Sequence, residues 1–285
     1  MSETQLLDRE LWRERARAHR ARLAPFVDAH LERCRRGEKH PVWDFLFTYY
    51  GLRPGQLLRW HPGFGVALAG GADEYGSARG YAVDGDSASV DTAWCARRRD
   101  FVEYLERLLA ATASRPAALG CFGLHEWAMV YRARDVRHPV PLRLGPAGAD
   151  AVVDAGSLRC THYDAYRFFT SDAAPKNLLP LSRESQVDSE QPGCLHAGMD
   201  LYKWAFKLLP GAPSELVADA FDLARDAREL DMRASPYDLT EHGFEPVRVE
   251  TAAGRAEYVR AQSALAERAA PIRDRLLALC RTWPA

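Results

Sequence analysis

Apolar residues recur at the three- and four-residue spacing of an α-helix over much of the chain. This spacing covers residues 93–112 and 122–133, and it resumes over 195–209, 214–234 and 251–281. A helix with one apolar stripe buries that stripe against a neighbouring element, so segments of this kind predict packed helices. We expect helices to make up more than about half of the residues.

The first ninety residues show three different patterns. Residues 5–36 combine many charges with spaced apolar positions and predict a long helix, bent or broken at Pro25. Residues 40–52 are dense in aromatic side chains and predict a buried helix that anchors the core. Residues 53–92 carry glycine or proline every few positions, which predicts loops and one short hairpin.

These patterns predict a mainly α fold. No internal repeat is visible and no linker divides the chain, so we expect a single helical domain over residues 1–285. It contains the N-terminal helix 5–36, the loop-rich insertion 53–92 and a C-terminal helical part over 195–281. A β-like pattern is confined to short pieces between 158 and 169, and any strands should be few and short.

Composition narrows the possible function classes. The chain has 285 residues, of which 47% are hydrophobic and 27% charged, as in ordinary globular proteins. Lys+Arg total 38 against Asp+Glu 39, which weakens any interpretation that depends on a generally basic, nucleic-acid-binding surface but still allows a local basic patch. No apolar stretch is long enough to span a membrane and the six cysteines form no C-x-x-C pair, so we expect a cytoplasmic protein with reduced thiols and no membrane partner.

Three segments place a histidine beside a carboxylate among aromatic residues. Imidazole and carboxylate groups together suit zinc or non-haem iron, and two histidines with one carboxylate leave coordination positions open. We therefore predict a common polar site for a divalent metal, iron or zinc. The candidate ligands are His125, His162, His196 and Asp200, with Glu126 and Asp164 as candidate catalytic groups.

The spacing within each segment limits how these side chains can meet. His196 and Asp200 are four residues apart, so a helix places them on one face. His162 and Asp164 are two residues apart and converge only in an extended segment. In that case H-x-D resembles the iron-binding pair of oxoglutarate-dependent oxygenases, although the chain lacks the strands that such a barrel requires.

The third segment offers one group at most. His125 and Glu126 are adjacent, so on a helix they point apart and we expect at most one to face the site. Our hypothesis is that His196, His162 and one of His125 or Glu126 converge closely enough to share a metal or a substrate proton.

Carboxylates are also concentrated in the predicted helix 214–234, where arginines alternate with them. This pattern favours a solvated face of ion pairs. The functional alternative is that one of these carboxylates turns inward as a ligand or catalytic base; the candidates are Asp219, Asp222, Asp226, Glu229 and Asp231.

Long motifs suggest a second function. At HPVWDFLFTYYGLRPGQLLRWHPGFG, HAGMDLYKW and RELDMRASPYDL the chain resembles actinobacterial proteins commonly labelled 3-methyladenine DNA glycosylase, from about residue 38 to 270. The resemblance implies excision of alkylated purines, through a hairpin whose amides grip phosphate and an aspartate some twenty residues later. Residues 209–212 match the opening of the hairpin, Pro213 replaces its second glycine, and Asp226 or Asp231 stands where the catalytic carboxylate is expected.

The sequence thus leaves three hypotheses open. The favoured one is a metal-dependent oxygenase or hydrolase that acts on a small-molecule substrate through the histidine–carboxylate site. The second is a DNA glycosylase with DNA as its partner and Asp226 as its catalytic residue. The third is a non-catalytic protein that binds a small ligand. The sequence does not predict an oligomeric state.

Overall fold

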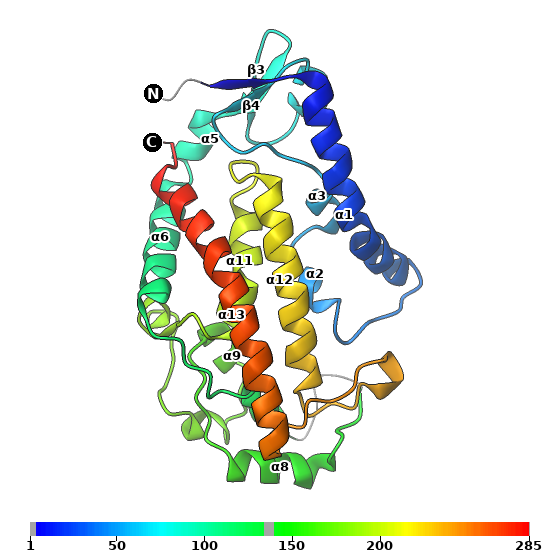
Figure 1. Cartoon of the computed structure of the whole chain (residues 1–285), viewed down its shortest axis with the longest axis vertical. Helices are drawn as coiled ribbons and strands as arrows, with labels where there is room; N and C mark the ends of the chain where they lie inside the picture. Colours follow the sequence, from blue (N-terminus) through cyan, green and yellow to red (C-terminus); the bar gives the residue numbers. More distant parts are fainter. Residues whose placement is uncertain (1–3, 134–139, 285) are drawn as a thin grey trace. The chain divides into compact units, whose positions relative to one another are not determined.

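A computed structural model describes residues 4–133 and 140–284 of the chain. Helices account for 56% of the residues and strands for only 7%, which confirms the mainly α fold (Figure 1). Contacts divide the chain into two compact units. Unit 1 comprises Met1–Arg107, Leu201–Asp222 and Ile272–Ala285, and unit 2 comprises Leu108–Asp200 and Leu223–Pro271. The single domain expected from the sequence stays a prediction.

The described elements fall into three groups. Unit 1 contains β1 (Gln5–Leu7), α1 (Arg9–Arg35), α2 (Phe45–Thr48), α3 (Pro54–Leu57), β2 (Val66–Leu68), α4 (Ala72–Tyr75), β3 (Tyr81–Asp84), β4 (Ser87–Val90) and α5 (Thr92–Ala96). Unit 2 contains α7 (Leu124–Ala128), α8 (Gly145–Ala155), α9 (Tyr163–Tyr166) and α10 (Gln186–Ser189), with short 3₁₀ turns at Ala174–Lys176 and Thr240–His242. The chain passes from one unit to the other within α6 (Arg99–Ser114), α11 (Leu195–Lys207), α12 (Ser214–Arg233) and α13 (Ala252–Arg281).

The four strands form one small sheet in unit 1, in the order β1-β2-β4-β3. β1 pairs with β2 in parallel, whereas β2 and β3 both pair with β4 in antiparallel orientation. β3 and β4 are joined by a tight turn in which Gly85 has φ 60°, a backbone conformation that glycine adopts without steric cost. The expected short hairpin in the loop-rich segment is therefore present.

The N-terminal helix is shorter than predicted. The side chain of Asp8 accepts a hydrogen bond from the backbone N–H of Glu10 and caps α1, so the helix begins at Arg9. Residues 5–7 form the edge strand β1 instead of a first helical turn. Pro25 lies inside α1 and does not end it.

The aromatic segment 40–52 contains much less helix than predicted. Only α2 is helical there, and Asp44 organises the chain around it. The Asp44 carboxylate accepts hydrogen bonds from the backbone N–H of His40 and from the Arg33 guanidinium, and it lies 2.9 Å from His30 Nδ1. Leu46 and Phe47 are buried, so the segment does anchor a core, but mainly through turns.

Two further segments differ from their predictions. The helix expected over 122–133 is limited to the five residues of α7, and the β-like segment around 161–169 forms the short helix α9. In addition, helix α8 has no counterpart among the elements predicted from the sequence. The long helices α6, α11, α12 and α13 confirm the periodic pattern.

A cluster of large apolar residues forms part of the core of unit 1 beside the sheet. Trp12 and Trp60 are almost fully buried and pack with Leu68 and Tyr75. Their indole N–H groups do not lack partners, since Trp12 donates to the Ala69 carbonyl and Trp60 donates to the Glu215 carboxylate. In this region aromatic side chains pack against one another, and each of the two indoles donates a hydrogen bond. No described helix of the protein is both long and apolar enough to cross a lipid bilayer.

Candidate metal centre

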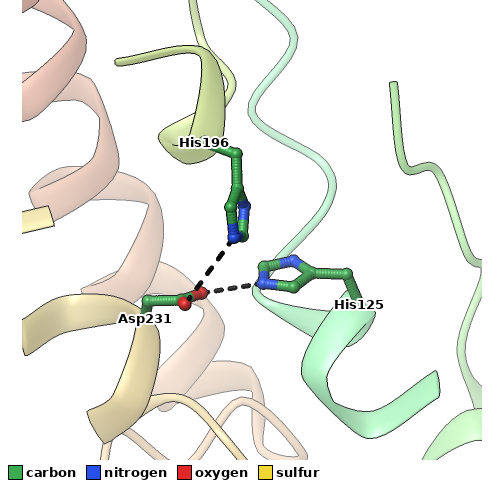
Figure 2. A group of neighbouring side chains, drawn as sticks. All are labelled: His125, His196 and Asp231. Atoms are coloured by element: carbon green, nitrogen blue, oxygen red, sulfur yellow. Dashed lines mark hydrogen bonds and ion pairs between the residues drawn. The ribbon is translucent and has the colours of Figure 1, made fainter. Parts of the chain in front are cut away.

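The interior of unit 2 contains two imidazoles that face one carboxylate (Figure 2). His125 is in α7, His196 in the first turn of α11 and Asp231 in the last turns of α12. His125 Nε2 lies 2.8 Å from Asp231 Oδ1, and His196 Nε2 lies 3.9 Å from Asp231 Oδ2. We call these three buried residues the first triad.

Local structure places His125 against the end of α12. Gly123 precedes α7 with φ 71°, and a Cβ atom at this position would lie 3.2 Å from the Cβ of Ala234. Glycine therefore permits both the left-handed backbone and the close approach. The indole of Trp127 then donates a hydrogen bond to the Ala234 carbonyl at 2.9 Å, which fixes α7 beside the turn that carries Asp231.

A buried arginine holds the carboxylate of the triad. Arg228 is one turn before Asp231 on α12, is 1% exposed, and donates a 2.9 Å hydrogen bond to Asp231 Oδ2. The same nitrogen lies 3.3 Å from Glu126 Oε1. His125 and Glu126 therefore both take part in this network, contrary to the expectation that at most one would face the site. They do so through different partners, since His125 contacts Asp231 and Glu126 contacts Arg228.

The two histidines of the first triad differ in pKa. Burial lowers the pKa of His125, but the charge of Asp231 and its hydrogen bond outweigh burial and raise this pKa well above its ordinary value. Burial and the neighbouring His125 charge lower the pKa of His196 to about 3. Burial raises the pKa of Asp231, but the charges of His125 and His196 outweigh it and lower this pKa. These pKa shifts favour a protonated His125 beside an ionised Asp231, with His196 neutral.

A second group of three buried residues lies in the same unit. His162 Nε2 lies 3.2 Å from Asp200 Oδ2 and 3.4 Å from Glu190 Oε1. His162 precedes α9, Glu190 follows α10, and Asp200 is one turn after His196 on α11. We call His162, Glu190 and Asp200 the second triad.

The three histidine rings lie near one another, but His162 and His196 belong to different groups of potential ligands, so the single shared site hypothesised from the sequence stays a prediction. The ring centroids of His125 and His196 are 4.5 Å apart, and those of His162 and His196 are 5.4 Å apart. The expected pairing of His196 with Asp200 takes a different form. Asp200 contacts His162, whereas His196 faces Asp231, so the two residues share a helix face but belong to different triads.

A small cavity adjoins the first triad. Its volume is about 10 Å³, roughly the space of one water molecule. His125, His196, Cys121, Tyr258 and Gln262 are among its lining residues. Gln262 is 2% exposed and donates a 2.7 Å hydrogen bond to the Gly193 carbonyl, but its Oε1 atom has no partner among the described residues. A buried amide oxygen of this kind can accept a hydrogen bond from a suitable donor.

The three candidate catalytic carboxylates lie in different surroundings and have different partners. Glu126 contacts Arg228, which in turn binds Asp231 of the first triad. Asp164 lies in the first turn of α9 and pairs with Arg183 and Arg167, so the H-x-D pair does not converge because its segment is helical rather than extended.

Asp226 lies away from the triads. It is about one-third exposed and pairs with Arg225 and Arg268. The solvated ion-pair face expected for 214–234 is therefore correct for Asp226 but wrong for the buried residues Arg228 and Asp231.

Two of the six triad residues were not proposed as ligands from the sequence. The hydrophobic pattern contains a signal for Asp231, because it continues the buried stripe of Ala220, Ala224 and Ala227 at helical spacing, whereas Asp226 lies off this stripe. An acidic residue in a buried stripe requires a partner. Glu190 follows a short helix in a polar, proline-broken segment, and no periodic pattern marks it.

The hairpin-like segment at 209–213 lies in unit 1, and its backbone groups make hydrogen bonds within the protein. Gly211 and Ala212 are buried. The Gly211 carbonyl accepts a hydrogen bond from Phe64, and the Ala212 N–H donates to the Leu208 carbonyl. These backbone groups are therefore not presented to a phosphate, and the resemblance to DNA glycosylases stays a prediction.

Comparisons with known proteins give no independent assignment. Protein-family models, curated proteins and solved structures were all searched, and none of them matches this chain. Function is therefore inferred from the buried groups of unit 2 and their geometry.

Proposed function

We propose that this protein is a metal-dependent enzyme that acts on a small molecule, with zinc or non-haem iron held by His125, His196 and Asp231. One observation carries the proposal: two imidazoles and a carboxylate, all buried, direct their ligand atoms to one point from three different helices. These atoms lie within 4.8 Å of one another.

The chemistry of the donor set fits such an ion. Zinc and iron both take imidazole nitrogen and carboxylate oxygen, and three protein ligands leave positions for water or substrate. His125 Nδ1 lies 3.6 Å from Cys121 Sγ, so this sulfur is placed to accept the ring N–H while Nε2 binds the metal. Arg228 donates to Asp231 Oδ2, the oxygen that His196 faces, and so orients this carboxylate. When bound, the ion supplies Lewis-acid polarisation of a substrate oxygen or of water.

The surroundings of the triad favour a small substrate. The adjoining cavity has room for about one water molecule and is far too small for an extruded purine base, and a substrate larger than water could reach the ion only if this cavity opened. A small substrate requires less opening than a purine base on a DNA strand.

Metal analysis of protein purified without a histidine tag tests the proposal. We expect the native chain to retain zinc or iron after dialysis, and Asp231→Asn to retain at most a tenth as much. Asp226→Asn is the matched control, because Asp226 is on the same helix but pairs only with surface arginines. A native protein that neither retains nor binds a divalent metal would contradict the proposal.

The same preparation distinguishes DNA repair from small-molecule chemistry. A mobility-shift series uses duplex DNA that carries an abasic-site mimic, at low salt, where phosphate contacts are strongest. We expect no binding. Tight binding that weakens steeply with salt would favour the glycosylase hypothesis instead.

A further inference from the structure

We infer that the second triad, His162, Glu190 and Asp200, is a second divalent-metal site, so that unit 2 holds a pair of neighbouring metal ions. This inference rests on the proposed function of the first triad. It assigns a role to buried charged groups that a single ion at His125, His196 and Asp231 leaves unexplained.

The potential ligand atoms of the second triad, like those of the first, lie within 4.8 Å of one another. His162 Nε2 lies 3.2 Å from Asp200 Oδ2 and 3.4 Å from Glu190 Oε1, and all three side chains are 2–3% exposed. Ligating atoms about 2.0–2.2 Å from a metal lie roughly 3–4 Å from one another, so a metal requires little rearrangement here. One imidazole and two carboxylates suit iron, manganese or zinc.

One helix joins the two sites. His196 and Asp200 are one turn apart on α11, and they contribute one ligand to each triad. The rings of His162 and His196 are stacked with centroids 5.4 Å apart and an interplanar angle of 30°. The two triads are therefore neighbours, with one ligand of each on adjacent turns of α11.

Neighbouring groups orient the second triad. The buried amide of Gln186 donates a 2.6 Å hydrogen bond to Glu190 Oε1, and Arg115 holds the Glu190 carbonyl at 2.8 Å. Metal-binding carboxylates are commonly fixed in this way by a surrounding layer of hydrogen bonds. Gln186 therefore holds the side chain of Glu190, and Arg115 holds its backbone carbonyl, where the carboxylate faces His162.

The two sites should differ in affinity. His162 Nδ1 lies 3.3 Å from the backbone N–H of Ala165 and accepts its hydrogen, so the ring proton is on Nε2, between the two carboxylates. A metal on Nε2 moves this proton to Nδ1, where it faces the Ala165 N–H. In the first triad the corresponding nitrogen of His125 faces Cys121 Sγ, which can accept its proton. We therefore expect the first triad to bind metal more tightly.

A pair of ions narrows the class of substrate. Two neighbouring metals hold two oxygen atoms at once, either both from the substrate or one from the substrate and one from water. The second triad thus favours a small substrate with two oxygen atoms, such as a carboxylate, a diol or an ester.

Titration of the metal-free full chain with Mn²⁺ tests the inference, and the electron paramagnetic resonance signal of free Mn²⁺ measures binding. Mn²⁺ prefers oxygen and nitrogen donors, so thiols contribute little. We expect two equivalents, the second at least tenfold weaker. Glu190→Gln should remove only the weak equivalent and Asp231→Asn only the tight one, whereas the exposed control Glu184→Gln should keep both. Asp200→Asn replaces Glu190→Gln if circular dichroism shows that the latter does not fold.

The outcomes separate the two proposals. A single equivalent that disappears in Asp231→Asn and persists in Glu190→Gln would overturn the second site and leave the first intact. In that case His162 is a hydrogen-bonded support for Asp200 and Glu190. Two equivalents that persist in both Glu190→Gln and Asp200→Asn would also overturn the assignment. No binding by the native chain would overturn both proposals.

Discussion

Both units bury histidines, but they surround them differently. In unit 1, His61 is 8% exposed, and its Nδ1 lies 2.9 Å from the Tyr81 hydroxyl. Burial, with smaller effects from the charges of Arg59 and His19, lowers its pKa to about 3. In unit 2, burial and the charge of His125 lower the pKa of His196 to about 3. A low pKa therefore does not distinguish these two histidines.

The neighbouring carboxylates do distinguish them. Within the described residues, no carboxylate lies within ion-pair distance of the His61 ring, and its partners are neutral groups. His196 has Asp231 at 3.9 Å and two further histidine rings within 5.4 Å. Burial alone leaves His61 among neutral partners, whereas burial beside a carboxylate gives His196 a group of ligand atoms that could hold a cation.

The largest expected effect comes from removal of the buried arginine of unit 2. Arg228→Met leaves the carboxylates of Asp231 and Glu126 without their guanidinium, and we expect a loss of about 3–5 kcal/mol in the free energy of unfolding. Urea denaturation measures it. Arg268→Met is the control and should cost less than about 1 kcal/mol, because its pair with Asp226 is exposed. Equal losses would show that the buried network contributes no more than a surface pair.

Metal-dependent stability should separate the histidines of the two units. A divalent ion at about one hundred times its Kd should stabilise the native chain by about 2.7 kcal/mol. His196→Ala should lose most of this gain, and His61→Ala should keep it, each compared with its own metal-free form. Thermal unfolding with and without Zn²⁺ measures the gain. The same gain in both variants would contradict the first triad.

The sulfur beside His125 should have a smaller effect. Cys121→Ala removes the partner of His125 Nδ1, and loss of such a partner typically weakens metal binding by about 10- to 100-fold. We expect a change near the lower limit because the 3.6 Å contact to sulfur is weak. The exposed Cys34→Ala serves as control in a competitive chelator titration. An unchanged affinity in Cys121→Ala would show that another group orients His125.

The smallest effect concerns pH and His61. In the folded state His61 stays neutral down to a pKa of about 3, whereas in the unfolded chain it takes up a proton below about pH 6.5. Protons therefore favour the unfolded state, and stability falls as pH decreases through this range.

His61→Gln removes this contribution. Relative to the native chain, the variant should gain about 1 kcal/mol in stability between pH 7.5 and pH 6. Urea denaturation at the two pH values provides the comparison. A difference between native chain and variant that does not change with pH would show that folded His61 is protonated near its ordinary pKa.

The fold followed from periodicity wherever helices are long. The stripes of α12 and α13 were visible because a helix must bury one face over many turns. Short elements were not predictable in the same way. Residues 5–7 became β1 and residues 163–166 became α9 because a cap and a strand partner decide elements of three or four residues.

The site was only partly predictable for a related reason. Residue types and aromatic surroundings indicated His125, His162, His196 and Asp200, and all four belong to the two triads. They did not indicate which carboxylate faces which imidazole, because that depends on how separate helices pack. Asp226 and Asp231 have the same side chain on one helix, yet one pairs at the surface and the other is fully buried.

The sequence by itself determined a mainly helical chain with an unusual number of histidine–carboxylate segments. The spacing of apolar residues within a helix is a local property, so it can be predicted from the order of residues. Only the tertiary structure decided that α7, α11 and α12 place His125, His196 and Asp231 together, while His162 joins Glu190 and Asp200. Convergence of residues more than a hundred positions apart depends on long-range packing, through contacts such as the approach of Gly123 to Ala234.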